Sequence, residues 1–81
     1  MKPRLDTKRF IGEFGGAEAV VFLLDAYGFD PPSRKGVDKW IERGKMDSNR
    51  IAQLHYIYAI EHGKRLDLTK YISFGTTDGA L

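Results

Sequence analysis

The fold of this chain is decided by residues 17–40, which read AEAVVFLLDAYGFDPPSRKGVDKW. In the first part of this stretch, apolar residues recur at helical spacing, which predicts a helix over 17–27 with one buried face. That face consists of Ala17, Val20, Val21, Leu24 and Tyr27. Gly28 supplies the left-handed stop that such a helix needs, and Pro31 and Pro32 cannot continue a helix. A turn is therefore expected directly after this helix.

A second helix is expected over 34–43, with Ser33 as its N-cap. The residues predicted to point into the core, at i, i+3 and i+4, are Val37, Trp40 and Ile41. Arg34 and Lys35 occupy the first turn, where the positive end of the helix dipole disfavours cations. Two helices joined by a turn, with polar side chains offered from the start of the second, are typical of the motif that enters the major groove of DNA.

Three further helical segments are expected outside this pair. They are 7–14 after the N-cap Asp6, 48–62 after Asp47, and a last helical turn through Leu68 and Ile72 after Asp67. No alternation predicts a strand, and no internal repeat is found. The expected architecture is all-α, with four to five helices in one domain over 1–74. Residues 75–81 have no periodicity and are expected to form a flexible tail.

Composition excludes several classes of protein. A chain of 81 residues has room for one modest core, and the absence of Cys excludes a disulfide scaffold and a thiolate metal site. The longest apolar run, over 19–24, is far shorter than the roughly 20 residues of a membrane span. No secretion signal is found, so a cytoplasmic location is expected. His55 and His62 have no further ligand at suitable spacing, and no catalytic motif is found. Neither metal, cofactor, small-molecule substrate nor enzymatic activity is therefore expected.

Positive charge is concentrated in residues 33–50. This segment carries six cations against three acidic residues, whereas the whole chain has a net charge of only +2. A positive segment on a nearly neutral body indicates a face directed at a polyanion. The alternative is a solvated surface of mixed charge.

The polar residues in and around the second helix have the chemistry of DNA contacts. Arg and Lys pair with guanine edges or phosphates, and Asp accepts from cytosine N4. The residues expected at base edges are Arg34, Lys35, Asp38 and Lys39. Asp38 has the alternative of pairing with Arg34 at i, i+4 and merely orienting it. Because amides and cations at helix starts bind phosphate, phosphate contacts are expected from Gly16, Ala17, Arg43, Lys45, Asn49 and Arg50.

The helix over 48–62 has more apolar surface than one small core requires. Ile51, Leu54 and Tyr58 share one face, and another face is expected to hold Tyr56, Ile57 and Ile60. Either residues 66–74 fold back over the second face, or a second subunit covers it. The second alternative predicts a homodimer with an interface formed by Tyr56, Ile57, Ile60, Leu68 and Ile72.

Three segments of the chain resemble the Cro-type helix-turn-helix repressors of temperate phages. They are DTKRFIGEFG over 6–15, LLDAYG over 23–28, and a Val37-x-x-Trp40 helix followed by RGKM over 43–46. The resemblance implies a lambda-repressor-like fold and a transcriptional repressor that binds palindromic operator DNA as a dimer. It implies that the helix over 33–43 enters the major groove, and it adds Ser33 to the base-facing residues.

The sequence departs from the pattern of this family at two places. The turn over 28–33 is about three residues longer than the usual turn. Gly16-Ala17 stands where the family often has a Gln that contacts a phosphate and supports the reading helix, so backbone alone is expected there. The alternative function is that of a small helical interaction module, such as an antirepressor or an inhibitor of a host protein. Such a module would bind through the helix over 48–62 and need no DNA.

Overall fold

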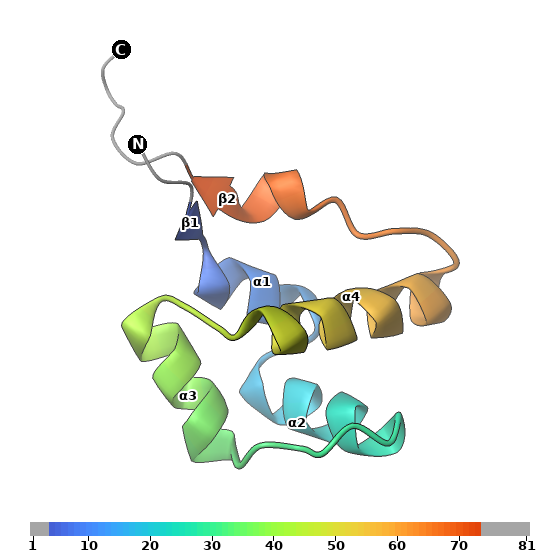
Figure 1. The fold of residues 1–81 in the computed structure, drawn as a ribbon, viewed down its shortest axis with the longest axis horizontal. Coiled ribbons are helices and arrows are strands. Elements are labelled where there is room, and N and C mark those ends of the chain that lie inside the picture. Colours follow the sequence, from blue (N-terminus) through green and yellow to red (C-terminus); the bar gives the residue numbers. More distant parts are fainter. Residues whose placement is uncertain (1–3, 74–81) are drawn as a thin grey trace.

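The computed structural model describes residues 4–73, and helices form most of its regular structure (Figure 1). The elements in chain order are β1 (Arg4–Leu5), α1 (Thr7–Glu13), α2 (Ala17–Ala26), α3 (Arg34–Arg43), α4 (Ser48–His62), the 3-10 turn η1 (Leu68–Tyr71) and β2 (Ile72–Ser73). The all-α class is confirmed, and the four long helices begin and end within one residue of their predicted bounds. The tail predicted over 75–81, together with Phe74, lies outside the described residues.

Local capping interactions set the helix boundaries. Asp6 and Ser33 each accept a hydrogen bond from the backbone N–H three residues further on, at 3.3 Å and 3.1 Å. At the opposite ends of α3 and α4, Gly44 and Gly63 adopt the left-handed conformation, with φ of 72° and 68°. A residue with a Cβ is disfavoured in that conformation, whereas glycine ends a helix there without strain.

One core joins all four helices. Its buried side chains are Phe10, Ile11, Val20, Leu24, Val37, Leu54, Ile57, Leu66 and Tyr71. The last two belong to the segment after α4, which folds back toward α1. There the Tyr71 carbonyl accepts from the N–H of Asp6, and the Tyr71 hydroxyl donates to Glu13 Oε1 at 2.5 Å. The segment therefore folds back as expected, but these two contacts are with α1, and it leaves the second face of α4 open.

The inward face of α4 differs from the predicted one. Leu54 and Ile57 are both fully buried, because their i, i+3 spacing places them on the same side of the helix. The prediction that Ile57 lies in a dimer interface is therefore wrong, since its side chain is used by the core of its own domain. Tyr56 and Ile60 stay exposed, and the folded-back segment does not cover them.

A short strand pair connects the two ends of the described chain. β1 and β2 are antiparallel, with Arg4 opposite Ser73 and Leu5 opposite Ile72. The expectation of a chain without strands is wrong at this place. Each strand has only two residues, so neither has an alternation of its own that a sequence pattern can reveal. The pair forms because the fold brings these distant segments together.

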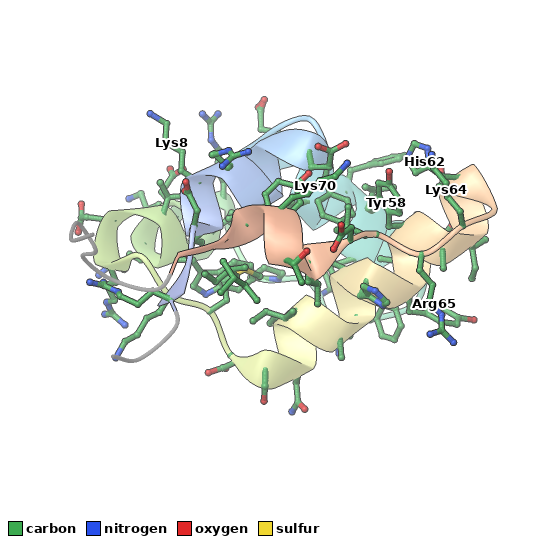
Figure 2. All side chains as sticks on the ribbon, turned by 90° about the horizontal axis from the view of Figure 1, so that it is seen from above. Lys8, Tyr58, His62, Lys64, Arg65 and Lys70 are labelled. Carbon is green, nitrogen blue, oxygen red and sulfur yellow. The ribbon has the colours of Figure 1, made fainter. Side chains whose placement is uncertain are left out.

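Aromatic rings connect α1 to the later part of α4. The Phe14 ring lies edge-on to Phe10 and to Tyr58, with centroids 5.3 Å and 6.0 Å apart. The Tyr58 ring in turn lies 4.2 Å from that of His62, and Figure 2 shows the two side chains next to each other. Such aromatic pairs contribute about 0.5–1.5 kcal/mol beyond the burial of their area. His62 is exposed, and its ring packs against Tyr58 of the same helix.

Candidate nucleic-acid interface

α3 stands at one end of the molecule, with its first turn near the first turn of α2 (Figure 1). The connection over 27–33 leaves the far end of α2 and runs back along that helix, a route that needs more residues than a tight turn. Phe29 in this connection packs against the core. The predicted inward residues of α3 are confirmed, since Val37 is fully buried and both Trp40 and Ile41 are half-buried against the core.

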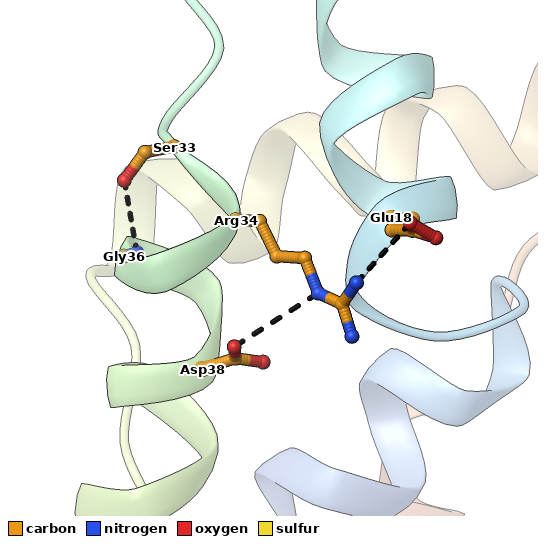
Figure 3. Close-up of polar contacts among 5 residues, drawn as sticks. All are labelled: Glu18, Ser33, Arg34, Gly36 and Asp38. Carbon is orange, nitrogen blue, oxygen red and sulfur yellow. Dashed lines mark hydrogen bonds and ion pairs between the residues drawn. The ribbon is translucent and has the colours of Figure 1, made fainter.

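Arg34 is held by two carboxylates of its own domain (Figure 3). Its Nη1 lies 3.2 Å from Glu18 Oε2 in α2, and its Nε lies 3.9 Å from Asp38 Oδ2, one turn along α3. All three side chains are more than half exposed, so these ion pairs contribute little to stability. Their effect is to orient the guanidinium toward α2. The pairing of Asp38 with Arg34, one of its two predicted roles, is present, and it competes with base contacts by both residues.

Glu18 belongs to this site although the sequence did not indicate it. At Gly16-Ala17, only backbone groups were expected to contact phosphate and to support α3. The Glu18 carboxylate, one residue further along α2, links the starts of α2 and α3 through Arg34 instead. An acidic residue in the first turn of a helix is favoured by the helix dipole wherever that turn lies. The partner of Glu18 is Arg34, and the two residues meet only because the 27–33 connection runs back along α2 to the start of that helix (Figure 1).

The outward face of α3 carries a row of cations. Lys35, Lys39 and Arg43 follow one another at intervals of four residues, so they lie along one line of the helix, on the side away from Val37. All three are exposed, and within residues 4–73 none of them forms an ion pair. Ser33, also exposed, uses its hydroxyl to cap the helix by accepting from the N–H of Gly36. We refer to Lys35, Lys39 and Arg43 as the cation row.

The residues expected at phosphates lie near the two ends of α3. Gly16 and Ala17 stand at the start of α2, and Gly16 offers no side chain to cap the amides of that helix. The remaining four lie at or beyond the end of α3 and are Arg43, Lys45, Asn49 and Arg50. Arg43, Lys45 and Asn49 are exposed, whereas Gly16, Ala17 and Arg50 are partly buried. The structure therefore divides the phosphate candidates into two groups, one at each end of the cation row.

Arg50 connects α4 to α3. Its guanidinium carbon lies 6.0 Å from the centroid of the Trp40 ring, and its Nη1 donates to Gln53 Oε1 at 3.1 Å. These contacts restrain the half-buried side chain beside α3. Arg4 brings a further cation to this end of α3, which the sequence did not predict. Its Nη2 lies beside Gly44, 3.6 Å from the place that a Cβ would occupy if Gly44 had a side chain. It reaches the end of α3 only through the strand pair.

Comparison with known protein families, curated proteins and solved structures finds no match to this chain. The resemblance to Cro-type repressors therefore depends on the residues alone. Within the part of the chain that the structure describes, no helix combines the length and apolar character needed to cross a membrane. The same part of the chain contains no group of three His, Cys, Asp or Glu side chains suited to hold a metal ion.

Proposed function

We propose that this protein binds duplex DNA through the outward face of α3. The observation that supports the proposal is the cation row, three exposed cations that form no ion pair within residues 4–73. They lie along one line of a helix whose opposite side is anchored by Val37 and Trp40. An α-helix fits the major groove, which is about 12 Å wide, and its outward cations then meet guanine edges and phosphates.

We assign the contacts to DNA according to the exposure and the ion pairs of each residue. Lys35 and Lys39 reach base edges or phosphates without breaking any ion pair. Arg34 contacts a guanine only when it leaves Glu18, so its role depends on that exchange. The phosphate contacts belong to Gly16, Ala17, Arg43, Lys45, Asn49 and Arg50, with Arg4 added by the fold. A regulator of this kind would act in the cytoplasm and repress transcription by covering an operator.

Selection of binding sites from random duplexes tests the proposal. We expect one enriched sequence, and an affinity for it that falls by orders of magnitude between about 50 and 200 mM salt, because phosphate contacts release counterions. The change Lys39→Ala should weaken binding to the selected site by about 1–3 kcal/mol.

The matched control is Lys70→Ala, which removes the same charge from an exposed lysine of η1 (Figure 2). This variant should bind the selected site nearly as tightly as the parent. A selection without enrichment, or equal losses in the two variants, would contradict the assignment of α3 as the DNA-binding helix.

A helical interaction module is the second candidate function. It is favoured by three large apolar side chains that are more than half exposed, Phe22, Tyr56 and Ile60. Apolar contacts depend weakly on salt, whereas contacts to phosphate are strongly weakened by it. A chain that shows no affinity for duplex DNA at low salt but binds a protein with little salt dependence would support this second function.

A further inference from the structure

The outward face of α4 carries no charge between Ser48 and Ile60. From Ser48 to Ile60 its exposed residues are all uncharged, and the large apolar side chains of Tyr56 and Ile60 are 54% and 52% exposed. The charged side chains of α4 contact other side chains of the domain, Arg50 lying over Trp40 and Glu61 accepting from the Tyr27 hydroxyl. An exposed helix face that is apolar and uncharged is typical of a surface that another protein covers.

A groove of about 540 Å³ lies on this side of α4. The small side chains of Ala52 and Ala59 line it and leave the space open, while Tyr56 and Leu68 border it with larger apolar groups. His55 and the cation Arg65 also line the groove, Arg65 from the segment that follows α4. An aromatic ring that entered this groove would have apolar contacts on several sides. The Tyr56 ring lies edge-on to Phe29 of its own domain, with centroids 6.1 Å apart, and its exposed part stands beside a groove able to receive a ring.

The spacing of these residues is self-complementary. Ala52 and Ala59 are seven residues apart, so they lie on the same line of the helix, two turns from each other. If two copies of α4 pack antiparallel about a two-fold axis between His55 and Tyr56, Ala52 of each copy faces Ala59 of the other. Small residues at these positions let the helices approach closely. The same axis directs each Tyr56 toward the groove of the opposite copy. Both copies then use the same surface, which is the definition of an isologous interface.

The charges at the two ends of α4 favour the antiparallel arrangement. Asp47, the N-cap residue, makes no capping hydrogen bond with its side chain, and Lys64 and Arg65 follow the other end of the helix (Figure 2). Antiparallel packing brings Asp47 of each copy toward Lys64 and Arg65 of the other, where Arg65 lines the groove. Parallel packing would instead place like charges together, which is unfavourable.

We propose that a second copy of this chain packs on the outward face of α4, with the two α4 helices antiparallel and each Tyr56 in the groove of the other copy. This interface retains Tyr56, Ile60 and Leu68 of the predicted one. It excludes the buried Ile57, and it does not include Ile72, which lies in β2. It adds Ala52 and Ala59. The proposal does not depend on DNA binding, because no residue of the cation row takes part in it.

Sedimentation equilibrium of the full chain without DNA tests the proposal. We expect a dimer, and we expect Tyr56→Ser to raise its dissociation constant about tenfold or more, since buried aromatic anchors dominate interfaces. The matched control is Phe22→Ser, which removes a large apolar side chain that is 69% exposed on α2. Circular dichroism confirms that both variants keep their helices. A parent chain that is monomeric at about 100 µM, some hundredfold above a micromolar dissociation constant, or equal effects of the two changes, would overturn the proposal.

Disulfide cross-linking tests the direction of the helices, since the chain has no cysteine of its own. A mixture of the Ala52→Cys and Ala59→Cys variants should form mixed cross-linked dimers in preference to dimers of either variant with itself. Preferred cross-links between two copies of Ala52→Cys would show a parallel arrangement and refute the antiparallel one. In a second test, Asp47→Lys should weaken the dimer and the added change Lys64→Asp should restore it. A double variant no tighter than Asp47→Lys alone would also contradict the proposed pairing of the two ends.

Discussion

α3 and α4 pack against the same core, yet their outward faces differ in chemistry. Six of the ten residues of α3 are charged, whereas the exposed residues of α4 from Ser48 to Ile60 are all uncharged. Folding requires only the inward residues, Val37 in α3 and both Leu54 and Ile57 in α4. The outward positions are therefore free to serve other contacts. This difference is the reason for proposing one surface for a polyanion and another for protein.

The contrast between inward and outward residues of α4 can be tested first, through the core that α3 and α4 share. We expect Leu54→Ala to lower the free energy of unfolding by about 2–5 kcal/mol, because it removes a fully buried side chain and leaves a cavity. Ile60→Ala, on the outward face of the same helix, should change it by at most about 0.5 kcal/mol in dilute solution. Urea unfolding measures both values. Equal losses would mean that the outward face of α4 also supports the fold of the single chain.

The second prediction concerns the segment that borders α4. The hydrogen bond from Tyr71 to Glu13, together with the nearby carboxylate charge, raises the pKa of Tyr71 from 10.0 to about 12. The stabilising contribution of this contact is thus complete below pH 10 and is lost as the pH rises toward 12. Tyr71→Phe should lose this part of the pH dependence of the melting temperature, which thermal unfolding across that range detects.

The control for this prediction is Tyr56→Phe, which alters an exposed tyrosine on α4 and should keep the pH dependence of the parent. If Tyr71→Phe and the parent lose stability in parallel between pH 10 and 12, other groups are responsible for the change.

The smallest effect is expected where α2 meets α3. Glu18→Gln removes the carboxylate that draws the Arg34 guanidinium toward α2 and repels phosphate. Affinity for duplex DNA should rise a few-fold, with little change in stability, because the ion pair is exposed. Asp25→Asn is the control, since it removes an exposed carboxylate from the last turn of the same helix. Filter binding at low salt compares the variants, and a loss of affinity in Glu18→Gln would show that Arg34 needs Glu18 to contact DNA.

The helices could be predicted from the sequence because their ends depend on neighbouring residues. Asp6 and Ser33 bond the backbone three residues away, and Gly44 ends α3 through its own conformation. The inward face of α3 was also predictable, since Val37 and Trp40 stand apart from an otherwise charged helix. The cation row is visible in the sequence for the same reason.

The sequence was less informative for α4 and for the chain ends. α4 has apolar residues on several sides, so spacing alone did not show that Ile57 faces the core while Tyr56 does not. The partner of Glu18 and the position of Arg4 depend on the 27–33 connection and on the β1–β2 pair. Each of these contacts joins residues that are far apart along the chain.

The sequence by itself determined the four helices, the capping hydrogen bonds of Asp6 and Ser33 and the row of cations on α3, since hydrogen bonds and side-chain spacing within a helix involve only near neighbours. The tertiary structure alone decided which side of α4 is buried, which carboxylates hold Arg34 and where the short strands pair. These outcomes depend on competition among many apolar and charged groups for positions around one core. Such competition is settled only when distant segments pack together.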